Sequence, residues 1–378
     1  MADGETMIWK EPALGGYPEP SMLGLAGIDR LRLSREGRVP MPPIAYITEM
    51  PFRELSRGHA GFEMPASPWF SNSAGLIPGG VLCTIADAAL GAPIHSQLGP
   101  GVSFTTAELS LTMLRPVRPD PAARISGSGH VIHLGRSLAL SEAFLFVEEP
   151  GSDREGTLVA HGTSRCSVFP PMDPIPDPPD EPPVLEQDYP GSDPSHPLRR
   201  PVQGAPLPEK VFAERSGLEI LRAQATGQLD PPPPIYFLTG LRLAAAEEGR
   251  VIFALPCTPW LSTSMGTVQG GFTAMLADFA LTGAAFSTAP AGTAIATLDL
   301  KVNFLRPVHP DGRELRADAR VEHRGRTLAI SSCRITNAEG KPVALATGSA
   351  MYLKGRPASL AGVDQLGSAA AADAAGGG

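Results

Sequence analysis

The stretch SPWFSNSAGLIPGGVLCTIADAAL, residues 67–90, decides the fold because it occurs twice. A shift of 191 residues lays it on TPWLSTSMGTVQGGFTAMLADFAL, residues 258–281. The same shift lays LRPVRPD (114–120) on LRPVHPD (305–311), and 21 of the 53 positions from Pro68 to Asp120 match their partners. Self-similarity at a fixed period is the signature of a repeated structural unit. The chain is therefore predicted to contain one domain twice.

Each copy shows the same order of predicted elements. A short helical segment (22–35 and 211–227) precedes two strands, PPIAYITEMPFREL and GHAGFEMP in the first copy and PPIYFLTGLRLAAA and GRVIFALP in the second. A helix follows over 79–98 and 270–285, and it should be buried because it is apolar nearly all round. Three or four alternating strands close each copy. One helix wrapped by a curved antiparallel sheet is the hotdog arrangement. The predicted fold class is α+β, with two hotdog domains packed as an intrachain pseudo-dimer.

The predicted domains span residues 22–168 and 211–354. Residues 169–210 separate them, and 169–208 hold 14 prolines among acidic and polar residues. Such a composition buries too little apolar surface to offset its ordering entropy, which favours an extended linker. We expect residues 1–21 to be a flexible extension and residues 355–378, which end in SAAAADAAGGG, to be a disordered tail.

Composition narrows the possible functions. The 378 residues carry a formal net charge of −8, which excludes a broadly basic nucleic-acid surface. The four cysteines include no Cys-x-x-Cys pair and the histidines no metal-spaced cluster, which favours a reducing compartment and no metal site. The most apolar stretch, GGFTAMLADFALTGAAF, contains Asp278 and is too short for a membrane span. We expect a cytoplasmic protein with neither nucleic-acid nor membrane partners.

Both predicted buried helices carry a carboxylate at the same position, Asp87 and Asp278. Each lies about two turns into its helix, so neither can be an N-cap. A buried charge is costly unless it is paired, protonated or exposed to a cleft. The two residues are therefore candidate catalytic carboxylates. The alternative interpretation is an Asp that ties the helix to a hydroxyl of the sheet.

A pair of glycines opens each of these helices, Gly79-Gly80 and Gly270-Gly271. A helix N-terminus offers free backbone N–H groups and the positive end of the helix dipole. Glycine also lets a ligand carbonyl approach that backbone closely. The pattern indicates an oxyanion hole. Alternatively, a tight turn requires the glycines for its dihedral angles.

Together these motifs resemble the PaaI-type acyl-CoA thioesterases over about 44–169 and 235–353. The motifs that carry the resemblance are Asn72-Ser-Ala-Gly75, Gly79-Gly80, Ala86-Asp87, Thr106-x-Glu-Leu, Leu114-Arg-Pro and Gly135-Arg136, and then Gly266, Gly270-Gly271, Ala277-Asp278, Thr297-x-Asp-Leu, Leu305-Arg-Pro and Gly325-Arg326. In that family two hotdog subunits pair and build each active site jointly. The resemblance implies that the two copies form this dimer within one chain. It also implies that two such chains assemble into a dimer.

The resemblance implies two composite sites. One combines Asn72, Gly79 and Gly80 of the first copy with Asp278 and Thr297 of the second. The other combines residues of the second copy with a carboxylate and a hydroxyl of the first: Thr263, Gln269, Gly270 and Gly271 with Asp87 and Thr106.

The sequence departs from the family just before the glycine pairs. The family usually has His there, and this chain has Pro78 or Gln269. Gln269 can still donate a hydrogen bond, whereas Pro78 cannot replace an imidazole. Thr263 also stands where the other copy has Asn72. We therefore expect the Asn72 site to be the more complete and the other site to be impaired or retuned.

The implied reaction is hydrolysis of an acyl-CoA thioester to a free acid and coenzyme A, with no cofactor apart from the coenzyme A of the substrate. The glycine amides polarise the carbonyl, and Asp278 serves as general base or nucleophile. Asn72 positions the water and Thr297 orients the carboxylate. The alternative is a non-catalytic protein on the same fold that binds acyl-CoA or another small ligand.

Four arginines recur with the repeat and are candidate ligands of the coenzyme A phosphates: Arg115, Arg136, Arg306 and Arg326. The planar guanidinium group suits phosphate because it binds two oxygens at once. An equally good interpretation is that these strand-end arginines pair with acids on the protein surface.

Overall fold

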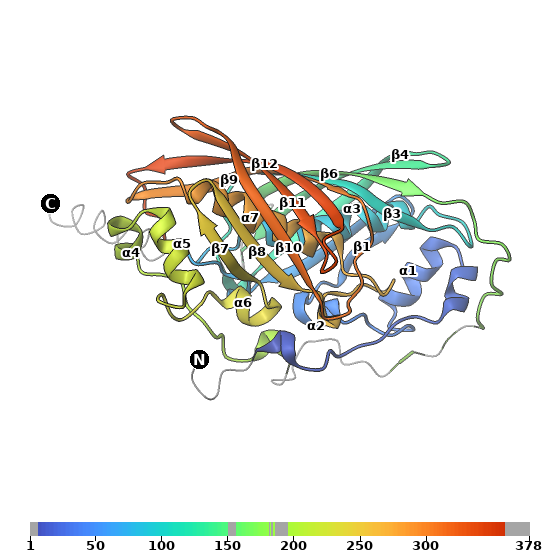
Figure 1. The fold of residues 1–378 in the computed structure, drawn as a ribbon. Helices are drawn as coiled ribbons and strands as arrows, with labels where there is room; N and C mark the ends of the chain where they lie inside the picture. Colours follow the sequence, from blue (N-terminus) through green and yellow to red (C-terminus); the bar gives the residue numbers. More distant parts are fainter. Residues whose placement is uncertain (1–6, 150–155, 181, 183, 186–195, 360–378) are drawn as a thin grey trace, which may run out of the picture.

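The computed structural model describes residues 7–149, 156–180, 182, 184–185 and 196–359. In this part of the chain twelve strands form one antiparallel sheet with the order β1-β2-β4-β5-β6-β3-β9-β12-β11-β10-β8-β7. The second half of this order repeats the first half in reverse, and the two halves meet at β3 and β9. The sheet curves over the two long helices, α3 and α7 (Figure 1). The prediction of two hotdog domains paired within one chain is confirmed.

The first copy holds three helices and six strands, with these bounds: α1 Gly27–Arg35, α2 Ile44–Thr48, β1 Phe52–Ser56, β2 His59–Ala66, α3 Gly79–His95, β3 Phe104–Met113, β4 Asp120–Leu134, β5 Leu138–Glu148 and β6 Thr157–Val168. The second copy repeats this order after one additional short helix: α4 Glu209–Glu214, α5 Gly217–Ala225, α6 Pro234–Thr239, β7 Arg242–Glu247, β8 Arg250–Pro256, α7 Gly270–Phe286, β9 Thr293–Phe304, β10 Glu314–Arg324, β11 Leu328–Thr336 and β12 Pro342–Lys354.

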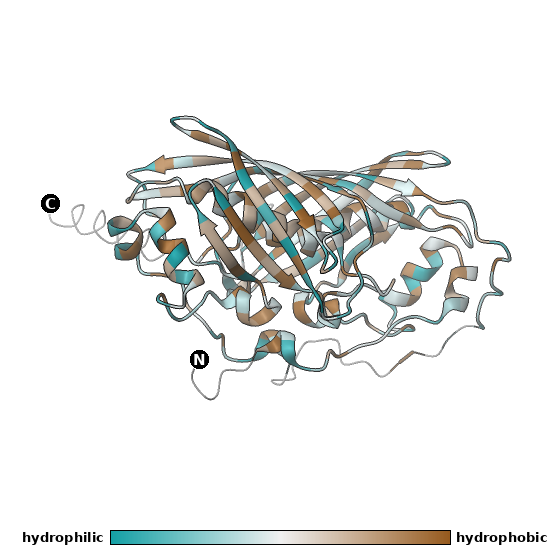
Figure 2. Ribbon diagram, in the orientation of Figure 1, coloured by the Kyte–Doolittle hydropathy of each residue, from teal (hydrophilic) through white to brown (hydrophobic). Residues whose placement is uncertain are grey.

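The strands curve around the central helices with one face buried. In β11 buried positions alternate with less buried ones, and hydrophobic and hydrophilic residues alternate along the strands (Figure 2). Strand side chains point to the two faces in turn, so this pattern places one set on the core. The central helices are buried on most sides, as their apolar sequences predict. The hydrophobic effect therefore fixes both the sheet and the helices that it wraps.

Glycine residues allow the two central helices to come into close backbone contact. A Cβ atom on Gly80 would lie 2.8 Å from the Cα atom of Met275, and one on Gly271 would lie 2.5 Å from the Cα atom of Thr84. No side chain fits between backbones this close. The second glycine of each pair therefore allows the start of one helix to touch the middle of the other, where the carboxylates lie.

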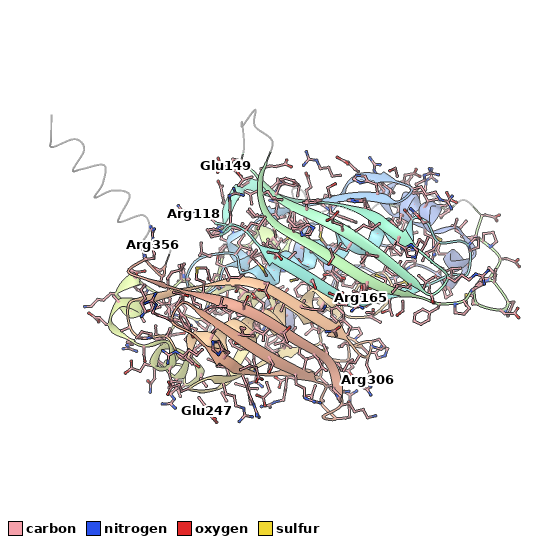
Figure 3. All side chains as sticks on the ribbon, turned by 90° about the horizontal axis from the view of Figure 1, so that it is seen from above. Arg118, Glu149, Arg165, Glu247, Arg306 and Arg356 are labelled. Atoms are coloured by element: carbon pink, nitrogen blue, oxygen red, sulfur yellow. The ribbon has the colours of Figure 1, made fainter. Side chains whose placement is uncertain are left out.

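A buried carboxylate joins the two halves of the sheet. Glu108 of β3 is 5% exposed and accepts a hydrogen bond of 2.8 Å from Nε of Arg165. Lys301 of β9, in the other copy, lies 3.8 Å from the same carboxyl group. From above, the two halves lie side by side and Arg165 is near their border (Figure 3). The cations on both sides compensate a charge that burial would otherwise make costly.

One secondary-structure prediction is wrong. The segments PPIAYIT and PPIYFLT are short helices, α2 and α6, rather than the beginnings of strands. A short apolar run fits a buried helix and a buried strand equally well, so periodicity could not separate them. Thr48 and Thr239 each donate a hydrogen bond to the carbonyl four residues earlier, a helical contact. Strands begin only after the turns that follow, at Phe52 and Arg242.

The segments outside the two domains are packed where they are described. Ile8 is fully buried, and the indole N–H of Trp260 donates to the carbonyl of Glu11 at 3.0 Å. Residues 7–21 thus differ from the flexible extension that we expected, because Ile8 joins the core. In the described part of the segment between the domains, Leu198 and Leu207 are buried. Residues 1–6, 181, 183, 186–195 and 360–378 lie outside the described part of the chain, and with them most of the expected tail.

Among the described residues, no helix combines the length and apolar character that crossing a membrane requires.

Candidate active site

The structure brings each carboxylate to the glycine pair of the opposite copy. The amide of Gly80 donates to Oδ2 of Asp278 at 2.7 Å. The amide of Gly271 donates to Oδ2 of Asp87 at 3.1 Å. Each contact joins the N-terminus of one central helix to the middle of the other. The positive end of the helix dipole lies at that N-terminus and favours the anionic carboxylate. The two composite sites named from the sequence therefore exist as pairs of neighbouring groups.

Asp87 is partly exposed and hydrogen-bonded on both oxygens. Oδ1 accepts a hydrogen bond of 3.3 Å from the hydroxyl of Thr106, and Oδ2 accepts the one from Gly271. Burial disfavours the charged form and raises the pKa of Asp87 to about 6, although Gly271, Thr106 and Gly270 act against that rise. At neutral pH the group is therefore mostly an anion, yet basic enough to accept a proton.

Asp278 is only 2% exposed. The hydroxyl of Thr282 lies 3.4 Å from Oδ1 and also shares a hydrogen bond of 2.8 Å with the hydroxyl of Thr297. Burial raises the pKa of Asp278, while the hydrogen bonds from Gly80, Thr297 and Thr282 lower it. Asp278 is thus buried and hydrogen-bonded by protein groups, as a carboxylate that stabilises the fold would be.

A cavity of about 490 Å³ opens at the Asp87 site. Five residues of the second composite site line it, namely Asp87, Thr106, Thr263, Gln269 and Gly270. Aromatic side chains form much of the remaining wall: Phe52, Phe62, Phe104, Phe169 and Phe304. An apolar cavity with a few convergent polar groups is the usual form of a small-molecule site. The space lies at the site that the sequence marked as impaired or retuned.

The side chain of Met113 lies close to the first glycine of the Asn72 site. A Cβ atom on Gly79 would lie only 2.3 Å from the methyl carbon of Met113. At the equivalent place in the other copy, Phe304 leaves 3.3 Å to a Cβ atom on Gly270. The end of the Met113 side chain is thus nearer to its glycine than Phe304 is to Gly270. The expectation that the Asn72 site is the more complete does not extend to the room for a substrate.

Asn72 and Thr263 shape the loops before the central helices. Oδ1 of Asn72 accepts hydrogen bonds from the amides of Ala74 at 2.9 Å and Leu76 at 3.1 Å. The hydroxyl of Thr263 accepts one from the amide of Met265 at 3.2 Å. Such side-chain contacts to nearby backbone stabilise a turn. The oxygen of Asn72 is therefore occupied by its own loop, although the sequence predicted that this residue positions water.

Gln269 is buried at the start of α7 with one polar atom unpaired. Nε2 donates to the carbonyl of Thr84 at 3.1 Å, which fixes the orientation of the amide. Oε1 is buried and has no hydrogen-bond partner among the described residues. Buried acceptors are nearly always paired, so an unpaired one that lines a cavity marks a place for a polar ligand group or a water.

Comparison with known proteins identifies the family. The model of the thioesterase superfamily matches residues 74–152 and 265–344, one match in each copy. The chain is 31% identical over 105 residues to acyl-coenzyme A thioesterase 13 of Homo sapiens and of Pongo abelii, and the match covers 28% of this chain and 74% of that relative. This chain belongs to the thioesterase superfamily. The family indicated by the sequence motifs is thereby confirmed.

Two solved structures are also similar to this superfamily member. The PaaI protein from the phenylacetic acid degradation operon of E. coli is 25% identical, with a TM-score of 0.33 over 37% of this chain and 98% of that one. The acyl-CoA thioesterase II TesB2 of Mycobacterium marinum is 13% identical, with a TM-score of 0.48 over 82% of this chain and 98% of that one.

The four arginines expected at the coenzyme A site of this thioesterase-superfamily chain do not lie together. Arg306 lines the rim of the cavity, on the second copy's half of the sheet (Figure 3). Arg306 and Arg115 each donate to a carbonyl of the neighbouring strand, at Pro342 and at Leu158. Arg326 borders a separate depression, and Arg136 lies exposed in the turn between β4 and β5. Arg306 is thus the one of the four that lines the Asp87 cavity.

The sequence did not single out two polar residues of the cavity, Arg30 of α1 and His95 at the end of α3. A signal for both existed in the repeat. Extending the self-comparison upstream with a shift of 190 aligns GIDRLR (27–32) with GLEILR (217–222) and places Arg30 on Ile220. A charged residue aligned with an apolar one near a predicted core is a departure that the repeat itself reveals.

Proposed function

We propose that the chain is an acyl-CoA thioesterase that works through one site, built around Asp87. One observation carries the proposal: Asp87 is in contact with the N-terminus of α7 and borders the 490 Å³ cavity, whereas Asp278 is only 2% exposed and Met113 lies against Gly79 beside it. Membership of the thioesterase superfamily and the names of the relatives support the reaction class.

The carbonyl of the thioester would be polarised at the start of α7. The amide of Gly271 makes the hydrogen bond of 3.1 Å to Asp87, and the amide of Gly270, which also lowers the pKa of Asp87, belongs to the cavity wall; we assign Gly270 as the donor to the carbonyl oxygen. The sequence predicted that both glycines of a pair perform this task. The division of labour between them follows from the contact with the carboxylate. Preorganised donors of this kind stabilise the charge that develops on oxygen in the transition state.

Asp87 would act as the general base. A water attacks the thioester carbon, Asp87 takes its proton, and collapse of the tetrahedral intermediate expels coenzyme A as the thiolate. Gln269 and Asp87 line the same cavity, so a water bound there beside Asp87 can lose its proton to the carboxylate. We choose this route over direct attack by the carboxylate because hydrogen bonds from Thr106 and Gly271 hold both oxygens of Asp87.

The test of this proposal is release of free thiol from short, medium, long and aryl acyl-CoA thioesters by the purified chain. The expected result is turnover well above buffer with at least one class. Tight binding of acyl-CoA with no thiol release from any of them would instead support a non-catalytic binding protein.

The rate should depend on pH through Asp87. A general base works as the anion, and burial places its pKa at about 6. We expect kcat/KM to be constant above about pH 7 and to fall about tenfold per pH unit below 6. A pH–rate profile from 4.5 to 8.5 measures this. A midpoint near 4, the ordinary pKa of an aspartate, would show that the general base is a solvent-exposed carboxylate rather than Asp87 in its buried state.

A further inference from the structure

The cavity wall contains a buried cation, and no described residue places an anion beside it. Arg30 is 9% exposed and lines the cavity. Nη2 donates to the carbonyl of Val102 at 3.2 Å, and Nε is buried with no hydrogen-bond partner among the described residues. Asp29, its neighbour in sequence, pairs instead with Arg32 at the surface. Burial alone lowers the pKa of Arg30, and no described carboxylate raises it. An uncompensated buried charge is costly, so the fold alone does not explain it.

The second copy shows what this position needs for packing. Gly27 and Gly217 start equivalent helices, and their amides donate to the equivalent carbonyls of Leu98 and Ala289, both at 2.9 Å. Arg30 therefore corresponds to Ile220.

The residues around Ile220 are apolar, whereas those around Arg30 include polar groups. Ile220 is 1% exposed and packs in an apolar cluster with Leu207 and Phe212. His95 corresponds to Phe286, whose ring lies against Phe212. One copy thus fills the region with apolar groups, whereas the other leaves a cavity and places a guanidinium and an imidazole in its wall. The difference points to a ligand rather than to packing.

Arg30 lies away from the reacting end of the cavity. Asp87, Gly91 and His95 line the cavity from one face of α3. Eight residues separate Asp87 from His95, which is about 12 Å along the helix axis. Arg30 is close enough to His95 to lower the pKa of that imidazole. Its end of the cavity is therefore about two helical turns from the carboxylate.

The depth of Arg30 distinguishes it from the rim. Most of the exposed lining residues belong to the loops of the second copy or follow β6, such as Met265, Leu305, Arg306 and Phe169, and Thr105 of β3 is exposed as well. Phe62 and Leu98, like Arg30, are buried lining residues of the first copy. In the proposed complex the bulky coenzyme A moiety occupies the exposed rim. The group that reaches Arg30 is then the acyl group.

We propose that the cavity selects acyl groups whose far end carries a carboxylate, and that Arg30 binds this carboxylate. The inference rests on the proposed thioesterase function and names its substrate class. A planar guanidinium matches a carboxylate with two parallel hydrogen bonds, and the aromatic wall suits the apolar stem between the two ends. Burial and the charge of Arg30 hold the pKa of His95 at about 3, so its imidazole is neutral and adds no second positive charge.

The experiment compares acyl-CoA esters of equal length with and without a terminal carboxylate: adipoyl-CoA with hexanoyl-CoA, and suberoyl-CoA with octanoyl-CoA. In the wild type we expect kcat/KM to favour the carboxylated ester of at least one pair by about 10- to 100-fold, the range for hydrogen bonds to a charged group. Arg30→Leu should remove or reverse this preference, and Arg30→Lys should keep part of it. Ile220→Leu, at the matching position of the other copy, should leave it unchanged.

Inhibition of the wild type by adipic acid monoamide and by hexanamide provides a second readout that needs no variant, because only the monoamide carries a carboxylate. The monoamide is expected to inhibit more strongly. Unfolding of Arg30→Leu by denaturant checks the fold, and this variant should be at least as stable as the wild type because an apolar side chain replaces an unpaired charge.

Three results would overturn the inference in distinguishable ways. Hydrolysis of the neutral esters with no gain from a carboxylate would refute it and leave the thioesterase function intact. An equal loss for neutral and carboxylated esters in Arg30→Leu, together with a loss of discrimination between coenzyme A and dephospho-coenzyme A as inhibitors, would assign Arg30 to a phosphate. Absence of thiol release from every ester would refute the proposed function itself.

Discussion

Asp87→Asn is expected to reduce thioester hydrolysis by about 10²- to 10⁴-fold, whereas Asp278→Asn should leave most of the activity. The asparagine keeps the size of the side chain and can still accept the hydrogen bond from Gly271, but it cannot take a proton from water. Asp278 is 2% exposed and Met113 lies against Gly79 beside it, whereas Asp87 borders the cavity, so we expect the substrate to reach Asp87. Steady-state thiol release by the two variants and the wild type measures the difference.

The two variants control for each other because the carboxylates are equivalent by duplication. Loss of activity in Asp278→Asn with activity retained in Asp87→Asn would place the chemistry at the Asn72 site. Loss in both would mean that both sites work or that the pair of helices is disturbed, and denaturant unfolding separates these two cases.

The same variant should gain stability. The folded-state pKa of Asp87 is about 6, above the ordinary 3.8, so its favourable contribution is present in full below about pH 4 and is lost as the pH rises through 6. Asp87→Asn has no charge to bury. We expect it to unfold like the wild type at pH 4 and to be more stable by about 2 kcal/mol at pH 8.

Gly271→Ala is expected to destabilise the fold by about 3 kcal/mol. The added methyl carbon would lie 2.5 Å from the Cα atom of Thr84 and 2.6 Å from the carbonyl oxygen of Cys83. These are backbone atoms of the other central helix and cannot rotate away, so the helices would have to separate. The free energy of unfolding, measured with denaturant, gives the size of the effect.

Gly91→Ala is the matched control in the same pair of helices. A Cβ atom there would meet nothing nearer than Cζ of Phe104 at 3.5 Å, which is an ordinary contact. Alanine favours a helix over glycine by up to about 1 kcal/mol, so this variant should be as stable as the wild type or more so. If Gly271→Ala unfolded like Gly91→Ala, the close crossing of the helices would not be a requirement of the fold.

The fold could be predicted because duplication makes local patterns recognisable. The shift of 191 residues aligned the glycine pairs with each other and Asp87 with Asp278, and the structure brings each carboxylate to the opposite glycine pair. Short apolar segments were harder, since a run such as IAYIT contains no periodicity that separates one helical turn from a strand.

Which of the two sites has the cavity could not be predicted, because space depends on tertiary packing. The motif at the Asn72 site is nearer to the family pattern, but Met113 of β3 lies against Gly79 there, whereas the cavity lies at the Asp87 site. Met113 and Phe304 are both apolar side chains at equivalent positions, and their sequence identities alone do not show which of them leaves room. The apolar cluster near Ile220 also includes Leu207 of the linker, a contact between segments that the repeat pattern does not reveal.

Met113 and Phe304 differ although they occupy equivalent positions, which shows that the two composite sites of one chain can evolve separately. In a homodimer with twofold symmetry, every substitution appears at both active sites, so neither can be altered alone. Here the two halves are encoded separately, and each substitution affects one site. The Asn72 site can then be selected for packing alone, while the Asp87 site acquires residues such as Arg30 for a particular ligand. Covalent fusion thus permits one composite site to adapt independently of the other.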